Sequence, residues 1–353
     1  MPLPPAIAAA FASQVDWCRL LSSPFTARLM EAAPLALADA PGRTASAVRD
    51  WSGEPVRDAL VLRLAGGLHA LARSGRAPAL AALYPPAVLP DTETLAAVLA
   101  AVLADPALDA ALRPWLDSAP QTNEVARSGV LMPGMMVIAG ATGLPLRLFE
   151  LGPSAGLNLC LDHWHYRLGT REAGDPASPV RIAPEWRGEP LPPLPDIRVA
   201  ARAGVDLNPL DVRDPATADR LLAYVWPDQP ERVARAAAAI AAVAADPPSI
   251  TRGDAAAFVA ANVAPEPGSC AVVFHSIAFQ YFPKDSRAAI AAHMASAGAS
   301  ATPAAPLAWL RYEMEGGQIG ALPTLRLTLW RGGEPEEHLL AHAHPHGTFL
   351  EWA

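Results

Sequence analysis

Cysteine is scarce in this chain: only Cys18, Cys160 and Cys270 occur among 353 residues, and no two of them form a CxxC pair. This scarcity excludes a disulfide framework and favours a reducing cytoplasm. Lysine is rarer still, with Lys284 alone, and 27 basic residues against 35 acidic ones leave a net charge of −8. Nucleic-acid binding needs a basic surface, so we expect a partner other than nucleic acid.

A basic N-terminal segment is also missing, so the opening MPLPPAIAAA does not resemble a secretory signal. The longest run without charge, between Arg127 and Arg147, contains Pro133, Pro145 and four glycines. We therefore expect a buried helix, a turn and a strand there, with no membrane contact and a cytoplasmic protein. Hydrophobic residues make up 52% of the chain and charged residues 18%, which excludes wholesale disorder.

Amphipathic helices are expected throughout the first third of the chain. Apolar residues at spacings of three and four are clearest at 6–21, 59–71 and 94–103. Capping residues that begin with Asp91 stand directly before the third of these helices. No alternating strand pattern precedes about residue 145. We therefore expect two domains, an all-helical domain over 1–118 and an α/β domain over 119–353.

The second part alternates apolar runs with helical patterns, as a doubly wound α/β sheet does. Strand candidates stand at 145–150, 197–206, 250–254, 270–275 and 307–313. A glycine-rich turn at 151–156 follows the first strand, and we expect a short helix after it at 157–164. A Pro-rich stretch at about 166–196 is interpreted as an insertion. The chain closes with an antiparallel hairpin of 324–330 and 338–352.

Carboxylates end three of the expected strands: Glu150, Asp206 and Asp254. The carboxyl ends of parallel strands share one edge of a sheet, so we expect these side chains to converge on a crevice. Carboxylates accept hydrogen bonds from ribose hydroxyls, amines or adenine N6, and Gly152 and Gly156 let the backbone approach a ligand closely. For one Asp alone, capping of the next helix is the competing interpretation. Three in order favour a binding site.

The stretch FELGPSAGLNL resembles motif I of the class I S-adenosylmethionine-dependent methyltransferases, GVDLNP resembles their ribose-binding second strand, and TRGDAAAF their adenine-contacting third strand. The C-terminal hairpin is similar to the last two strands of that fold. Over roughly 120–353, the resemblance implies a methyltransferase-like Rossmann fold with a mostly parallel sheet and a C-terminal antiparallel hairpin. It also implies S-adenosylmethionine as cofactor and methyl transfer, with a small-molecule acceptor as the substrate we expect. Over most of the chain, the combination of QTNE, ELGPSAGLNL, GVDLNPLDV, VWPDQPER, HSIAFQYFP and HPHGTFLEW is similar to an uncharacterised bacterial family, domain-of-unknown-function family 2332.

The methyltransferase resemblance implies cofactor-binding roles for the turn and the two following strand ends: Glu150, Gly152, Ser154, Gly156, Asn158, Asp206 and Asp254. Glu150 and the two glycines would hold the methionine end, Asp206 the ribose and Asp254 the adenine. One spacing departs from the family, because Asp206 follows Glu150 by 56 residues instead of about twenty. The Pro-rich stretch must then be an insertion, and Glu172 and Asp175 lie nearer the usual spacing.

Acceptor-side catalytic candidates follow the fourth expected strand: His275, Gln280 and Tyr281. Methyl transfer needs proximity and a dry pocket, with a base where the acceptor must lose a proton. His275 is the candidate base. A buried histidine that is satisfied by the backbone is the competing interpretation.

A polar cluster precedes the apolar helix: Gln121, Asn123, Glu124 and Arg127. Methyltransferases place such a segment over the methionine end of the cofactor or over the acceptor, so the resemblance implies a substrate-binding role. Residue type alone favours an N-terminal helix cap at Thr122 or Asn123.

Two other functions remain open from the sequence. The turn GPSAG matches GxSxG, the nucleophile elbow of α/β-hydrolases, in which Ser154 would attack with Asp206 and a histidine as partners. The histidine would be one of His342, His344 and His346. Such an elbow normally follows several strands, whereas only helices are expected before this one. The third hypothesis is a non-enzymatic protein that binds an adenosyl ligand.

The C-terminal histidines have no Cys, Asp or Glu partners at clear ligand spacing, so we expect no metal site.

Overall fold

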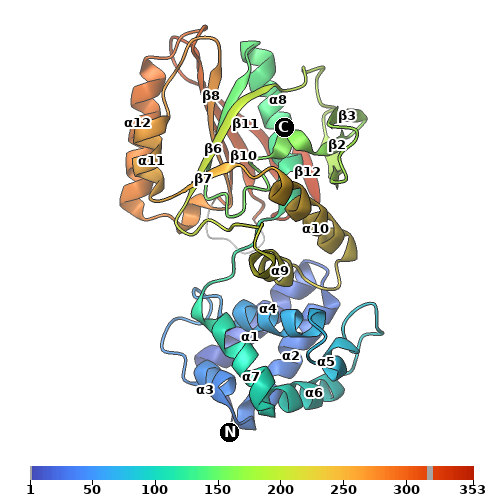
Figure 1. The fold of residues 1–353 in the computed structure, drawn as a ribbon. Helices are drawn as coiled ribbons and strands as arrows, with labels where there is room; N and C mark the ends of the chain where they lie inside the picture. Colours follow the sequence, from blue (N-terminus) through green and yellow to red (C-terminus); the bar gives the residue numbers. More distant parts are fainter. Residues whose placement is uncertain (1, 316–320) are drawn as a thin grey trace. The chain divides into compact units, whose positions relative to one another are not determined.

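The computed structural model describes residues 2–315 and 321–353, which divide into two compact units (Figure 1). The first unit comprises residues 1–122 and 214–237, and the second comprises 123–213 and 238–353. Helix α10 (Pro230–Ala245) contributes residues to both units. The predicted domain boundary between residues 118 and 119 stays a prediction.

All the regular secondary structure described in the first unit is helical. Its helices are α1 (Pro5–Leu20), α2 (Pro24–Asp39), α3 (Arg43–Arg49), α4 (Leu60–Arg73), α5 (Pro78–Ala81), α6 (Thr92–Ala104), α7 (Pro106–Leu112), the 3₁₀ helix η1 (Arg113–Asp117) and α9 (Pro215–Ala223). The three helices predicted from spacing are confirmed as α1, α4 and α6. Asp91 caps α6, because its side chain accepts a hydrogen bond from the backbone N–H of Thr94.

A distant segment, residues 214–237, packs with these N-terminal helices. Asp228 accepts hydrogen bonds from the N–H of Phe25, at 2.7 Å, and from the hydroxyl of Ser23. The side chain of Gln229 donates to the carbonyl of Leu21 at 3.0 Å. The sequence analysis did not foresee this association, because it joins residues that are about 200 positions apart.

The second unit is built on a nine-stranded sheet in the order β5-β12-β11-β10-β9-β8-β1-β6-β7. The strands are β1 (Leu146–Leu151), β5 (Glu185–Gly188), β6 (Val199–Asp206), β7 (Ser249–Arg252), β8 (Cys270–Ser276), β9 (Leu307–Glu313), β10 (Thr324–Trp330), β11 (Glu336–Ala343) and β12 (Phe349–Trp352). Neighbours from β7 to β9 are parallel, and β9 to β12 form an antiparallel meander. The prediction of an α/β fold with a large, mostly parallel sheet is confirmed, as are the five predicted strands and the C-terminal hairpin.

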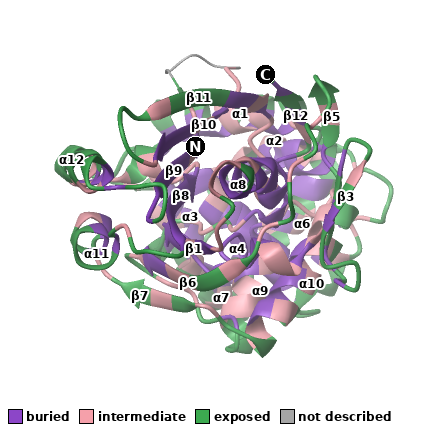
Figure 2. Cartoon of the chain, turned by 90° about the horizontal axis from the view of Figure 1, so that it is seen from above, coloured by how far each residue is buried: buried purple, intermediate pink, exposed green. Residues whose placement is uncertain are grey.

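Helices cover both faces of this sheet. Helices α11 (Ala255–Asn262) and α12 (Lys284–Ala299) lie on one face and α8 (Ser128–Thr142) on the other (Figure 1). In Figure 2 the central strands β1 and β8 and helix α8 are buried, whereas the edge strands β5 and β7 are largely exposed. The continuous apolar run of β8 is therefore explained by burial on both faces.

The apolar stretch before β1 is a core element. Residues 125–142 are long and apolar enough to cross a membrane, and 72% of this window is buried inside the fold. Such burial is that of a core helix and not of a helix that faces lipid. The expected helix, turn and strand between Arg127 and Arg147 are confirmed as α8, a turn at Gly143 and the start of β1.

The Pro-rich stretch contains a small second sheet of order β3-β2-β4. Its strands are β2 (His165–Leu168), β3 (Arg171–Gly174) and β4 (Arg181–Ile182). In the sequence, β2 to β5 come between β1 and β6. In the main sheet, β1 and β6 are direct neighbours. The long spacing between Glu150 and Asp206 is therefore occupied by β2 to β5, and their interpretation as an insertion stays a prediction.

Candidate functional site

The candidate site lies at the edge where the parallel strands end. Four carboxylates stand there, at or just after the ends of β1, β6, β7 and β9: Glu150, Asp206, Asp254 and Glu313. Because these strands are parallel, their carboxyl ends share one edge of the sheet. The convergence expected for the first three carboxylates is therefore present at the level of the backbone.

Glu150 is the most deeply buried of the four carboxylates, with only 1% of the residue exposed. Its Oε2 atom is buried and has no hydrogen-bond partner among the described residues. Burial raises the pKa of this carboxyl to about 8, the negative charge of Asp206 adds to the rise, and Arg127 opposes it. The acid at the end of β1 is therefore mostly protonated at neutral pH and lacks a partner for one oxygen.

The turn after β1 is held in left-handed backbone conformations. Gly152, Ser154 and Gly156 have φ values of 75°, 55° and 81°, and an L residue such as Ser154 pays a strain there of about 1–2 kcal/mol. A Cβ on Gly156 would stand 2.6 Å from Cγ of Pro248. The glycines therefore serve the turn geometry and its close packing.

The short helix predicted at 157–164 is wrong, because residues 154–160 form turns and only Leu161–His163 form a 3₁₀ helix, η3. Side chains occupy the backbone groups that a helix would use. The carbonyl of Leu157 accepts from the Trp164 indole at 3.0 Å, and its N–H donates to Asn123 Oδ1 at 2.9 Å. The turn consequently lacks the α-helix N-terminus that binds phosphates in dinucleotide sites.

Three members of the predicted substrate cluster lie in the second unit. Asn123 accepts from Leu157 as described, and Glu124 caps the 3₁₀ helix η2 (Val125–Arg127) by accepting from the N–H of Ala126 at 3.0 Å. Arg127 donates to the carbonyls of Ser276, at 3.0 Å, and Pro345, at 2.9 Å. The cap is thus Glu124 rather than Thr122 or Asn123.

The remaining member of this cluster, Gln121, is the next-to-last residue of the first unit's N-terminal segment and lies outside regular secondary structure. The predicted cofactor residue Asn158 is 1% exposed, and its Oδ1 accepts from the hydroxyl of Ser128 at 2.8 Å. This hydrogen bond ties the turn to the first residue of α8.

Asp206 and Asp254 both hold backbone N–H groups. Asp206 Oδ2 accepts from Ser154 at 2.9 Å and Oδ1 from Asn208 at 2.8 Å. Asp254 caps α11 by accepting from Ala257 at 3.0 Å, which lowers the pKa of its carboxyl, and it also accepts from the Ser286 hydroxyl. The capping interpretation thus describes Asp254 in this structure, and ribose and adenine contacts stay predictions.

His275 is fully buried and both of its ring nitrogens have partners. Its Nδ1 is 2.6 Å from Glu313 Oε1, and its Nε2 is 3.1 Å from the indole nitrogen of Trp309. Because an indole N–H can only donate, Nε2 carries the lone pair and Nδ1 carries the proton of a neutral imidazole. The base role stays a prediction, and it would require the Trp309 hydrogen bond to break.

Gln280 and Tyr281 lie on the 3₁₀ helix η4 (Phe279–Tyr281) and are exposed, with Tyr281 78% accessible. Of the three catalytic candidates, His275 is therefore buried, whereas Gln280 and Tyr281 lie at the surface.

Glu313 was missed by the sequence analysis. It is the last residue of β9, and its Oε1 accepts from His275, from Ala278 N–H at 3.0 Å and from Phe279 N–H at 3.1 Å. Its Oε2 is buried without a partner among the described residues. The signal was available, because Glu313 ends a predicted strand just as Glu150 and Asp206 do.

His342, His344 and His346 do not lie on one strand, because only His342 is within β11. Strand β11 ends at Ala343, and Gly347, with φ 68°, closes a turn by donating to the carbonyl of His344 at 2.7 Å. The second arm of the predicted hairpin, 338–352, therefore consists of two strands, because this turn separates β11 from β12. In residues 2–315 and 321–353, no three His, Cys, Asp or Glu side chains are grouped to hold a metal ion.

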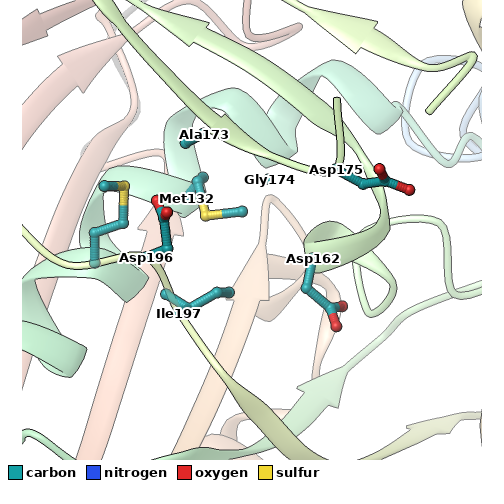
Figure 3. Close-up of a pocket in the computed structure, with 8 residues that line it drawn as sticks. Met132, Asp162, Ala173, Gly174, Asp175, Asp196 and Ile197 are labelled. Atoms are coloured by element: carbon teal, nitrogen blue, oxygen red, sulfur yellow. The ribbon is translucent and has the colours of Figure 1, made fainter. Parts of the chain in front are cut away.

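A cavity of about 260 Å³ lies elsewhere in the second unit (Figure 3). Its lining combines methionines of α8 with carboxylates and small residues: Met132, Met136, Asp162, Ala173, Gly174, Asp175, Asp196 and Ile197. Asp162 is held by Arg202 through two hydrogen bonds of 2.7 Å. Asp196 and Ile197 precede β6, whereas Asp206 ends it, so the cavity lies toward the opposite end of that strand.

The comparisons identify a family and no closer relative. A family model described as "Uncharacterized protein conserved in bacteria (DUF2332)" matches residues 8–352. No curated protein and no solved structure matches the chain. Because the match spans nearly the whole sequence, the chain belongs to the DUF2332 family.

Proposed function

We propose that this member of the DUF2332 family is an S-adenosylmethionine-dependent methyltransferase with a Rossmann-like sheet and a small-molecule acceptor. The strand order supports the fold assignment. Numbered along the chain, the five parallel strands β1, β6, β7, β8 and β9 lie in the order 3-2-1-4-5. This is the order of the doubly wound sheets that bind nucleotide cofactors at the carboxyl ends of their strands.

The unpartnered Oε2 of Glu150 is the observation that carries the proposal. A buried polar atom without a hydrogen bond is costly, and a ligand that donates a hydrogen bond or bears positive charge removes that cost. The missing helix N-terminus and the acid at the strand end disfavour phosphate-bearing cofactors. S-adenosylmethionine carries an ammonium group, a sulfonium and no phosphate, so these residues fit it.

Each of these residues would then contact a different part of the cofactor. Glu150 would bind the cofactor's amino group, and the turn from Gly152 to Gly156 would pack against its methionine end. The two Asp206 oxygens have further acceptor capacity beyond the N–H groups they already hold, which leaves room for ribose hydroxyls. When bound, S-adenosylmethionine supplies an electrophilic methyl group. The chain supplies orientation and exclusion of water.

Titration calorimetry with S-adenosylmethionine and S-adenosylhomocysteine tests the proposal. We expect one site per chain with a dissociation constant near 1 μM, or about −8 kcal/mol. Glu150→Gln should weaken binding by about tenfold or more, because it removes a charge-assisted hydrogen bond. Glu334→Gln, at an exposed glutamate, is the matched control and should bind like wild type. Absence of binding by folded wild-type protein contradicts the proposal.

A serine hydrolase is the second candidate function, and one observation favours it. Ser154 has a left-handed backbone, and its buried Oγ has no hydrogen-bond partner among the described residues. A nucleophile needs a base within hydrogen-bond reach, and the same observation leaves Ser154 without one. Labelling of wild type by a fluorophosphonate probe, with none in Ser154→Ala, would favour hydrolysis. Cofactor binding without turnover over a broad acceptor panel would favour the non-enzymatic hypothesis.

A further inference from the structure

Glu313 is an ionised carboxylate, and one of its two oxygens has no hydrogen-bond partner among the described residues. Burial by itself raises the pKa of Glu313, but hydrogen bonds from His275 and from the N–H groups of Ala278 and Phe279, with the charge that His275 carries when protonated, outweigh it and hold the pKa below its usual value. All three donors bind Oε1, while Oε2 is buried and has no partner among the described residues.

In the tautomer that its ring contacts define, His275 donates a hydrogen bond to Glu313 but brings no positive charge. Trp309 donates to Nε2 of His275, so His275 is the neutral tautomer that donates from Nδ1. The groups that lower the pKa of Glu313 include no arginine and no lysine. A buried anion of this kind is stabilised most by a cation that also donates a hydrogen bond.

The loop that holds Glu313 lies against the glycine turn. A Cβ on Gly152 would stand 3.0 Å from Cβ of Ala278 and 3.7 Å from the ring of Phe282. Phe279 stacks on His275 at 4.5 Å and contacts Phe282 at 5.5 Å between ring centroids. The carboxylate, at the end of β9, is therefore bound by a loop that touches the proposed cofactor turn and carries two half-buried phenylalanines.

The backbone of this loop is fixed at a strained residue. Ile277 has φ 48°, which is rare for a β-branched residue, and its N–H donates to the carbonyl of Tyr312 at 2.8 Å. The residues directly after Ile277 supply the two N–H groups that bind Glu313 Oε1. The strain thus accompanies a conformation in which both loop N–H groups bind Oε1, and Oε2 has no hydrogen bond among the described residues.

We propose that Glu313 binds a cationic amino group of the acceptor, while Phe279 and Phe282 pack against its apolar part. A carboxylate with a low pKa is a weak general base but a strong partner for an ammonium group, so Glu313 positions the acceptor by ion pairing. The term acceptor rests on the proposed methyltransferase function, whereas the amine site rests on the geometry of Glu313.

Calorimetry with phenethylamine and its uncharged analogue 2-phenylethanol tests this site on the full chain, with and without S-adenosylhomocysteine. We expect wild type to bind the amine about tenfold or more tightly than the alcohol, because only the amine forms a charge-assisted hydrogen bond. Glu313→Gln should lose that preference, and Glu334→Gln should keep it. Equal affinities in wild type, no binding of either probe, or a preference retained by Glu313→Gln would overturn the proposal.

A measurement on wild type alone keeps the proposal testable if Glu313→Gln does not fold. Phenylacetate has the same ring and a negative charge, so we expect the affinity order amine, alcohol, carboxylate, and any other order contradicts the amine site. Binding of S-adenosylhomocysteine is measured separately. Its absence together with an amine preference would reject the methyltransferase function while supporting the site at Glu313.

Discussion

Asp206 holds Ser154 in its left-handed conformation: Asp206 Oδ2 accepts from the Ser154 N–H at 2.9 Å, while Oδ1 accepts from Asn208 at 2.8 Å. A side chain at the end of β6 thereby fixes the turn that follows β1. The turn and the second strand end are one structural feature, although 52 positions separate these residues in the sequence.

Asp206→Ala should destabilise the protein by about 1–2 kcal/mol, because two backbone N–H groups lose their acceptor. Asp206→Asn keeps one carbonyl oxygen and should lose less. Urea unfolding of both variants measures the difference. Asp211→Ala, at an exposed residue paired with Arg213, should stay within about 0.5 kcal/mol of wild type. Similar losses for all three variants would contradict this role of Asp206.

Gly156→Ala should cost about twice as much stability as Gly268→Ala. Both glycines have positive φ, 81° and 85°, so both variants carry the left-handed penalty of about 1–2 kcal/mol. Only Gly156 also lacks space, with Pro248 2.6 Å from the added Cβ, whereas nothing lies within 4 Å of a Cβ on Gly268. Urea midpoints of the two variants separate packing from backbone strain. Equal losses would show that Pro248 moves aside at little cost.

The strands of the sheet could be predicted because each is a local apolar run with recognisable ends. The same rule, an acid where a strand ends, identified Glu150 and Asp206, and applied once more it would have identified Glu313. What distinguishes Glu313 is its three donors, one from β8 and two from the loop after it, and no local pattern shows them.

The segment after the glycine turn could not be predicted from local spacing. Its apolar pattern suits a helix, but the side chains of Asn123 and Trp164 bind the backbone of Leu157. The packing of 214–237 with the N-terminal helices has the same origin, since Asp228 reaches Phe25 across the sequence. In both places distant polar contacts outweigh local propensity.

Glu150 should make the stability of the protein fall as pH rises. Its pKa is about 8 in the folded protein and near 4.5 when unfolded, so the folded state binds the extra proton between these values. The stabilisation is complete below about pH 4.5 and is lost as pH rises through 8. Glu150→Gln should remove this part of the pH dependence. Unfolding midpoints at pH 6 and pH 9 test it, and an unchanged dependence in the variant contradicts the prediction.

Binding of a cationic ligand at Glu150 should release a proton. The carboxyl is mostly protonated in the free protein at pH 7, and a nearby positive charge favours its ionised form. Affinity for S-adenosylmethionine should therefore rise from pH 6 toward pH 8, above which the ligand's amino group loses its own proton and affinity falls. Calorimetry in buffers of different ionisation enthalpy counts the protons. If wild type releases about as few protons on binding as Glu150→Gln, near zero per site, Glu150 does not ionise on binding.

His69 should make the first unit sensitive to acid. Burial lowers the pKa of His69 to about 4, against about 6.5 for an exposed histidine, and its Nδ1 lies 3.0 Å from the carbonyl of Ala223. The unfolded chain gains a proton between pH 6.5 and pH 4 while the folded unit does not, so stability falls as pH falls through that window. His69→Asn offers an N–H near the position of Nδ1 and cannot titrate. Urea midpoints at pH 7 and pH 5 should therefore drop less in this variant than in wild type. His338→Asn, at an exposed residue, should show the wild-type drop, and an equal drop in His69→Asn would assign the acid sensitivity to other groups.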